Sequence, residues 1–137
     1  MRAVLDPNLL ISAALSPGGS PGRLFRYWLE GDYDLVVSPM LLDELERALG
    51  YAKLKDRVPP HETEELIELV SRGGVMVEDP TLIPEVRSPD PDDEYLIALA
   101  SISRSVLVSG DKDLLGLSDQ IPVYSPAGFL VLIEAPS

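Results

Sequence analysis

Short apolar runs alternate with longer amphipathic segments along the chain, and Pro or Gly residues mark most of the boundaries between them. The runs are Val-rich and flanked by turn residues, which predicts strands at 2–5, 34–37, 74–77, 105–108 and 121–124. The longer segments predict helices at 8–15, 22–30, 39–49, 60–72, 91–103 and 126–134. Fully apolar strands such as 106–108 are typical of a parallel sheet that is covered on both faces.

The alternation of strands and helices predicts an α/β protein. We expect a doubly wound, three-layer α/β/α sandwich, in which right-handed crossovers join the strands of a central, mostly parallel five-stranded sheet. Several predicted helices begin with a capping residue followed by Pro: Ser38-Pro39, Asp90-Pro91 and Ser125-Pro126. The chain contains no repeat or linker, so we expect a single domain over residues 1–137.

Composition narrows the possible functions. The absence of Cys excludes disulfides, thiolate zinc sites and cysteine nucleophiles, and it is compatible with the cytoplasm. No stretch approaches the roughly 18 consecutive apolar residues of a membrane span, and the N-terminus does not look like a secretory signal. We therefore expect a cytoplasmic protein with no membrane partner.

The formal net charge is −12, from 23 acidic and 11 basic residues. This balance argues against tight passive binding to a polyanion, because Lys and Arg supply most of the affinity for phosphates. It suits a protein that recruits divalent cations or meets a basic partner. The basic residues cluster in two places: Arg23 with Arg26, and Arg47 with Lys53, Lys55 and Arg57. Either cluster could contact a phosphate backbone, although solvated helix faces are the more common explanation of such clusters.

Two acidic residues stand at the ends of buried strands. Asp6 directly follows the first strand, and Asp111 follows the strand at 105–108 in a turn where Gly110 permits a tight backbone. The carboxyl ends of strands form the edge at which open α/β sheets bind ligands, so we expect both carboxylates at that edge. Taken alone, Asp111 could also simply cap the short turn at 112–116.

A third acid lies on a helix. On the predicted helix at 39–49, Glu44 shares the inward stripe of Leu41 and Ala48, whereas Arg47 points elsewhere. An ionised Glu that faces a core is costly unless it is paired or bound to a metal. A Glu at the edge of the stripe could also reach water.

The segment at 88–94 carries four acids in five residues and opens a strongly apolar helix. A helix N-terminus relieves part of their repulsion. Capping by Asp90, with Asp93 completing a capping-box-like arrangement, would account for two of them. Because this helix is apolar nearly all round, periodicity leaves open whether Asp92 or Asp93 points into a site.

Together these acids predict a metal site at one edge of the sheet. Like charges within a few ångströms raise each other's pKa unless a cation neutralises them. Oxygen ligands without His or Cys select Mg²⁺ or Mn²⁺ over zinc. Such ions lower the pKa of bound water and clamp a phosphodiester for in-line attack.

Other chemistries lack the residues that they need. His61 is the one histidine and lies at a polar helix start, so neither a Ser-His-Asp triad nor a His-ligated zinc site is expected. The Gly-rich stretch at 18–22 has no Lys and follows no strand, so it is a loop rather than a phosphate-binding motif. A phosphotransfer domain with Asp6 as acceptor needs a second Asp two residues later, where this chain has Asn8.

The four acidic segments resemble those of the PIN-domain family, the metal-dependent nucleases that include the VapC-type toxins of toxin–antitoxin pairs. Residues 1–13 resemble the family's opening strand and Asp-x-Asn turn. Val-Val-Ser-Pro-Met-Leu-Leu-Asp-Glu-Leu resembles the segment that contributes its Glu, and Asp-Pro-Asp-Asp-Glu-Tyr-Leu-Ile-Ala-Leu-Ala the segment with its third acid. Leu-Val-Ser-Gly-Asp-Lys-Asp-Leu-Leu is similar to the motif of the fourth acid, and the likeness spans essentially the whole chain.

This resemblance implies a PIN-like fold and a metal-dependent endoribonuclease, the toxin of a toxin–antitoxin pair and a homodimer. It implies Asp6, Glu44, Asp93 and Asp111 as catalytic residues and as ligands of Mg²⁺ or Mn²⁺, supported by Asn8, Ser109 and Asp113. The spacing to Ala100 in this motif favours Asp93 over Asp92. The acidic surface would suit an antitoxin segment that places an Arg or Lys in the carboxylate pocket.

The chain departs from the family pattern at Pro7, where the family usually has Thr or Ser. Pro7 removes a hydroxyl and a backbone N–H beside the expected metal site. The alternative function is therefore a catalytically inactive PIN-like module that binds nucleic acid or protein, and the net charge of −12 also supports it.

Overall fold

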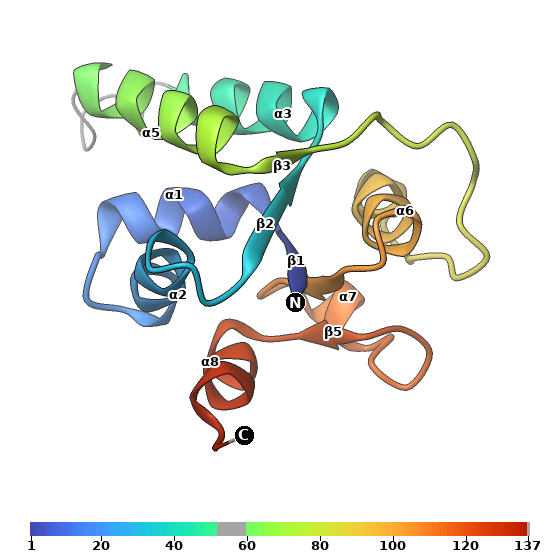
Figure 1. Cartoon of the computed structure of the whole chain (residues 1–137). Helices are drawn as coiled ribbons and strands as arrows, with labels where there is room; N and C mark the ends of the chain where they lie inside the picture. Colours follow the sequence, from blue (N-terminus) through green and yellow to red (C-terminus); the bar gives the residue numbers. More distant parts are fainter. Residues whose placement is uncertain (52–59, 137) are drawn as a thin grey trace.

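A computed structural model describes residues 1–51 and 60–136 (Figure 1). At its centre is a five-stranded sheet with the strand order β3-β2-β1-β4-β5, in which every pair is parallel. The strands are β1 (Arg2–Leu5), β2 (Asp34–Val37), β3 (Val75–Met76), β4 (Val106–Val108) and β5 (Val123–Tyr124). The predicted α/β fold with a central, parallel five-stranded sheet is confirmed.

Helices cover both faces of this sheet. They are α1 (Pro7–Leu15), α2 (Ser20–Leu29), α3 (Pro39–Leu49), α5 (Pro60–Gly73), α6 (Glu94–Ile102), α7 (Lys112–Leu115) and α8 (Pro126–Glu134), with a 3₁₀ turn, η1 (Pro91–Asp93), before α6. In Figure 1, α1, α2 and α8 lie on one side of the sheet and α6 and α7 on the other, while α3 and α5 extend the first layer at the β3 end. Within 1–51 and 60–136, no helix is long and apolar enough to cross a bilayer.

Three predicted elements differ from the structure for identifiable reasons. The edge strands β3 and β5 have two residues each rather than four, because each pairs with a neighbour on one side alone. The predicted helix at 91–103 is split, because the N–H of Asp93 donates to the C=O of Asp90 at 3.1 Å and closes a 3₁₀ turn before α6 begins. Lys53, Lys55 and Arg57 lie outside the described residues.

The expected capping-box-like role of Asp93 is wrong. Asp93 is the N-cap residue of α6, but its side chain makes no capping hydrogen bond. The 3₁₀ turn places Asp93 before the helix instead of inside its first turn, so its carboxylate is not aimed at the first free N–H groups. This carboxylate is left available for another partner.

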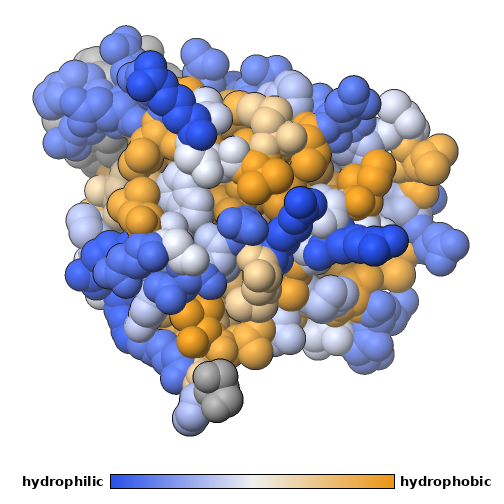
Figure 2. Space-filling model, viewed as in Figure 1, coloured by the Kyte–Doolittle hydropathy of each residue, from blue (hydrophilic) through white to orange (hydrophobic). Residues whose placement is uncertain are grey.

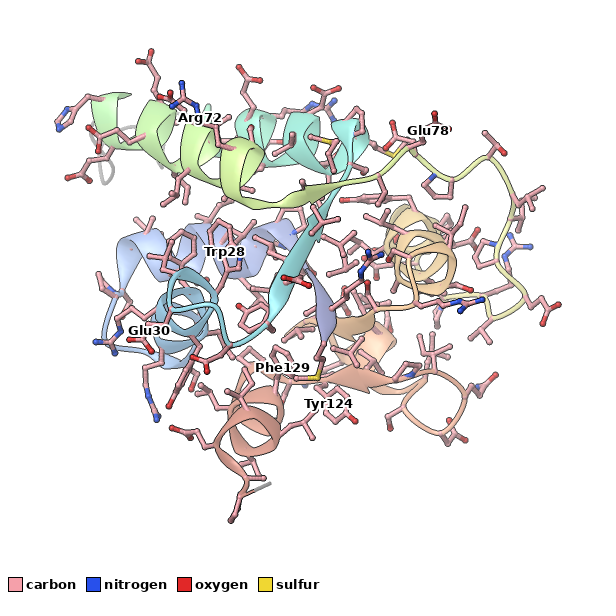
Figure 3. All side chains as sticks on the ribbon, viewed as in Figure 1. Trp28, Glu30, Arg72, Glu78, Tyr124 and Phe129 are labelled. Carbon is pink, nitrogen blue, oxygen red and sulfur yellow. The ribbon has the colours of Figure 1, made fainter. Side chains whose placement is uncertain are left out.

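The core explains why the sheet can hold polar residues at one edge. The side chains of Val4, Leu35, Leu107 and Val108 are at most 1% exposed, so the central strands are buried on both faces. Helix α8 packs against the core through Phe129, whose ring lies edge-to-face on Tyr33 with ring centroids 5.2 Å apart. Phe129 also lies beside Tyr124 of β5 (Figure 3).

The carboxyl ends of β1 and β4 lie side by side. Leu5 pairs with Val108 in register, and the N–H of Asp6 donates to the C=O of Val108 at 3.0 Å. Helix α1 starts at once after Asp6, with Pro7 at its first position, where a missing N–H leaves no helical bond unmade. The sheet edge therefore places residue 6 directly beside residues 109–111.

The outer surface mixes polar and apolar side chains. On the face seen in Figure 2, hydrophobic and hydrophilic residues are interspersed. Among the residues that the structure describes, the most exposed large apolar ones are Leu82, Ile83 and Val131, at 70–81% exposure. Leu82 and Ile83 belong to the long segment between β3 and η1.

Gly22 holds the link between α1 and α2 tightly. A Cβ at this position would lie 2.1 Å from the carbonyl oxygen of Pro17. We expect Gly22→Ala to lower the free energy of unfolding by about 2 kcal/mol, because the backbone of Pro17 must move. Urea unfolding measures this change. Gly18→Ala is the matched control, because its Cβ would meet nothing within 4 Å, and equal losses in both variants would contradict the prediction.

Candidate functional site

A cavity of about 610 Å³ opens at the carboxyl edge of the sheet, between the starts of α1 and α6 and the side of α3. The four acids expected in the site all line it: Asp6, Glu44, Asp93 and Asp111. Asp90 lines it too. Residues that are more than 100 positions apart in the sequence therefore meet in one concave, acidic space.

Asp6 is fixed by hydrogen bonds to both of its carboxylate oxygens. Its Oδ1 accepts the backbone N–H of Asn8 at 3.0 Å, as expected of the N-cap residue of α1, and its Oδ2 accepts the hydroxyl of Ser109 at 2.9 Å. Burial raises the pKa of Asp6, these two hydrogen bonds oppose the rise, and the charge of Asp111 adds to it. The carboxylate is oriented but is not neutralised by any basic group among these partners.

Ser109 links the first acid to the fourth. Its side chain is fully buried, and its Oγ donates to Asp6 while accepting the backbone N–H of Asp111 at 3.0 Å. Asp111 in turn is the N-cap residue of α7, and its Oδ1 accepts the N–H of Asp113 at 2.8 Å. The expected cap role of Asp111 is thus present together with its place in the cavity.

The three expected supporting residues act in different ways. Ser109 supports the site through its side chain, whereas Asn8 and Asp113 each donate a backbone N–H to a carboxylate of the site. The side chains of Asn8 and Asp113 are themselves exposed.

Asp93 is the acid with the least favourable surroundings. It is 9% exposed, and among the described residues its Oδ2 is the buried side-chain oxygen without a hydrogen-bond partner. Burial raises its pKa to about 7, with further contributions from hydrogen bonding to Asp111 and from the charges of Asp111, Asp90 and Asp6. The side chain of Asp92, the other candidate in this segment, lies outside the description.

These observations test whether the residues fit a hard divalent cation. One oxygen from each of Asp90, Asp93 and Asp111 lies within 4.8 Å of the others. Buried polar atoms in proteins almost always have a partner, so the partnerless Oδ2 of Asp93 calls for one. All the donors are carboxylate oxygens, the ligands that Mg²⁺, Mn²⁺ and Ca²⁺ prefer. The donor set fits such an ion.

Glu44 faces the cavity from α3, but it does so together with Arg47. Its Oε1 accepts Nη1 of Arg47 at 2.9 Å, and the two side chains are 44% and 65% exposed. The expectation that Arg47 points elsewhere is wrong: residues three apart are neighbours on a helix, and the long Arg side chain reaches back into the cavity. An exposed pair of this kind contributes little stability, so it is easily exchanged for another partner.

Sequence reasoning missed two further cavity residues, Tyr95 and Asp90. Burial raises the pKa of the Tyr95 phenol, and the charges of Glu44, Asp6 and Asp93 raise it further, so its hydroxyl stays protonated. Periodicity gives no signal for Tyr95, because its helix is apolar nearly all round. Asp90 gives none either, because its motif is typical of a helix cap. Arg23, by contrast, pairs with Glu134 of α8 at 2.8 Å and does not line this cavity.

Comparison with known proteins identifies the family. The family model of the PIN domain matches residues 2–113. The uncharacterized protein MJ1680 of Methanocaldococcus jannaschii is 28% identical over 125 residues, which cover 88% of this chain and 77% of that protein.

Two crystal structures have the same fold. PAE2754 from Pyrobaculum aerophilum matches with a TM-score of 0.71 and 20% identity, over 99% of this chain and 97% of that one. VapBC2 from Rickettsia felis, bound to a DNA fragment from their promoter, matches with a TM-score of 0.62 and 12% identity, over 91% of this chain and 98% of that one. At these identities the two structures support the fold alone. The family match confirms the resemblance inferred from the acidic segments, and the chain belongs to the PIN-domain family, whose members are typically nucleases.

Proposed function

We propose that this protein is a Mg²⁺- or Mn²⁺-dependent endoribonuclease that hydrolyses RNA phosphodiester bonds. The observation that carries the proposal is the buried Oδ2 of Asp93, which has no partner among the described residues and lies in a cavity lined by further carboxylates. Such a cluster is unfavourable as bare protein and becomes favourable around a cation.

Asp6, Glu44, Asp93 and Asp111 would hold one or two ions. A divalent cation bound there supplies a water of lowered pKa and neutralises charge on the phosphodiester. The chain's own contribution is position: Ser109 joins the carboxylate of Asp6 to the backbone of Asp111 in a single hydrogen-bond chain.

Two other cavity residues suit a phosphate substrate. Arg47 is the one basic residue that lines the cavity in the described part of the chain, and a guanidinium donates two parallel hydrogen bonds to phosphate oxygens. The Tyr95 hydroxyl, kept protonated by its surroundings, is a further donor toward the same group. A Glu44 that served as ligand to a cation would no longer hold Arg47, whose guanidinium would then be free for the substrate.

The same proposal makes the protein the toxin of a toxin–antitoxin pair, a homodimer that acts in the cytoplasm. The family and the fold shared with VapBC2 support it. The net charge of −12 and the acidic cavity favour an antitoxin segment with basic residues, one of which could occupy the carboxylate pocket in place of the cation.

A catalytically inactive binding module is the alternative, and Pro7 is the observation that favours it. Pro7 is buried and lines the cavity, where it adds an apolar wall and no donor. However, Asp6 still receives the N–H of Asn8, so Pro7 does not disturb the orientation of the first acid. An inactive module would bind Mn²⁺ and cut no RNA.

Replacing the first acid tests the nuclease proposal. We expect Asp6→Asn to reduce Mn²⁺-dependent cleavage of single-stranded or structured RNA by more than about 100-fold, since changes behind a metal ligand alone cost about 10–100-fold. End-labelled RNA resolved on denaturing gels gives the rate. Asp43→Asn, an exposed carboxylate on α3, is the control and should cleave like the parent. Undiminished cleavage by Asp6→Asn would remove the mechanism.

The raised pKa of Asp93 predicts how the stability of the metal-free protein varies with pH. Its folded value of about 7 lies above the ordinary value of 3.8, so the folded state holds this proton more tightly than the unfolded state. This contribution is fully present below about pH 4 and is lost as pH rises toward 7.

Asp93→Asn carries no such proton. In EDTA we therefore expect the variant to gain stability over the parent between pH 5 and pH 8, and to lose the stabilisation that Mn²⁺ gives the parent. Urea unfolding at both pH values, with and without Mn²⁺, measures the difference. If the stabilities of parent and variant changed with pH in parallel, the pKa of Asp93 would not be raised in the folded state and the prediction would be wrong.

Arg47 should affect substrate binding more than turnover. We expect Arg47→Gln to raise KM for RNA at least about tenfold, because the variant loses the charge and the two parallel hydrogen bonds of the guanidinium, while kcat changes little. Arg47→Lys should recover part of the loss, because it keeps the charge without the fork. Steady-state kinetics separate the two constants, and a fall in kcat at unchanged KM would contradict this role.

A further inference from the structure

Asp90 lies among the acids of the cavity although it is not one of the four expected metal ligands. Among the described residues, the group of acids whose oxygens all lie within 4.8 Å of one another contains Asp90, Asp93 and Asp111, but neither Asp6 nor Glu44. A cation with oxygen ligands at about 2.0–2.6 Å separates opposite ligands by about 4–5 Å. Three oxygens at this spacing therefore suit a single ion.

The backbone of η1 explains why Asp90 and Asp93 come together. The C=O of Asp90 accepts the N–H of Asp93, and the N–H of Asp90 donates to the hydroxyl of the buried Ser88 at 3.1 Å. In a 3₁₀ turn, side chains three residues apart eclipse each other, so both carboxylates lie on the same side. A regular α-helical start at Pro91 would separate them by a larger rotation.

The partnerless Oδ2 of Asp93 is an independent sign of a ligand at this place. Asp93 is 9% exposed and therefore 91% buried. It belongs to the same group of acids as Asp90 and Asp111. Helix capping accounts for Asp111, whose side chain caps α7, but not for Asp93, whose side chain makes no capping bond. A cation would hold together three carboxylates at this spacing and supply a partner for the unsatisfied Oδ2 of Asp93.

We propose that Asp90 is a direct ligand of a divalent cation, which it holds together with Asp93 and Asp111. The inference rests on the proposed metal-dependent function and deepens it by adding a fifth carboxylate to the site. Asp90 then does more than begin a helix: the Ser88–Asp90–Asp93 turn positions two ligands at once.

Mn²⁺ titration of the full-length protein tests the assignment. Isothermal titration calorimetry compares the parent with Asp90→Asn, Asp93→Asn and the control Asp43→Asn, whose carboxylate is exposed outside the cavity. We expect Asp90→Asn and Asp93→Asn each to weaken Mn²⁺ binding at least about tenfold, as loss of a ligand should cost no less than a change behind one. The control should bind like the parent.

A cysteine substitution separates a ligand from a residue that merely shapes the turn. Because the chain has no Cys, Asp90→Cys introduces a single thiol, and Asp43→Cys places the same thiol outside the cavity. Thiolates prefer soft metals, so Cd²⁺ should bind Asp90→Cys at least about tenfold more tightly than Asp43→Cys and give the ultraviolet absorption of a cadmium–sulfur bond. A purely structural role for Asp90 predicts no such difference.

The outcomes are distinguishable. Parent-like Mn²⁺ affinity in Asp90→Asn, or equal Cd²⁺ binding by the two Cys variants, would overturn the role of Asp90 and leave the nuclease proposal standing. A parent that binds no Mn²⁺ would overturn both. If Asp90→Asn does not fold, as circular dichroism would show, the Cys pair decides the assignment.

Discussion

The parallel pairing of β1 with β4 is the contact on which the candidate site depends. The ladder extends one residue past β1, where the N–H of Asp6 donates to the C=O of Val108, and Ser109 then continues it with a side-chain hydrogen bond to Asp6. Because both strands are buried in apolar surroundings, polar groups at their ends must find partners at the sheet edge. The same hydrogen bonds that finish the sheet therefore orient the first acid and join it to the turn that carries Asp111.

The unfavourable electrostatic energy of the site is confined to a few carboxylates, whereas the stability of the fold comes from the apolar core. Asp93 and Asp6 are buried carboxylates with raised pKa values, and neighbouring acids add to both. A folded protein tolerates such repulsion only when the rest of the structure is stable without it. Here the buried side chains of the central strands and of Leu41, Leu45 and Phe129 form an apolar core, which can hold the edge in a conformation that the carboxylates alone would not choose.

Much of the fold and the main features of the site could be predicted from the sequence, because both follow from strand ends. The bounds of β1, β2, α3 and α8 match those predicted from apolar runs and Ser-Pro starts, and acids placed after strands or on inward helix positions do meet in the cavity. Edge strands were predicted too long, since an apolar run does not reveal how many neighbours it will have. The 3₁₀ turn before α6 depends on one backbone hydrogen bond, and periodicity in an apolar helix carried no signal for Tyr95. Arg47 was misplaced because a helical wheel fixes its Cβ direction but not the reach of a long side chain.

A protein with a net charge of −12 is an unexpected partner for a polyanion such as RNA. A metal ion bound at the carboxyl edge of the sheet would resolve this conflict. Without a metal ion, the acids repel phosphate. Arg47, the one basic side chain that lines the cavity in the described part of the chain, is paired with Glu44. Under the proposed function, the carboxylates would be neutralised by the divalent ion that they hold, and Glu44 as one of its ligands would leave Arg47 free. Binding free energies are reciprocal, so RNA that uses the freed guanidinium must also tighten the binding of the ion. On this proposal, the net charge limits passive binding to RNA but does not limit binding that depends on the metal.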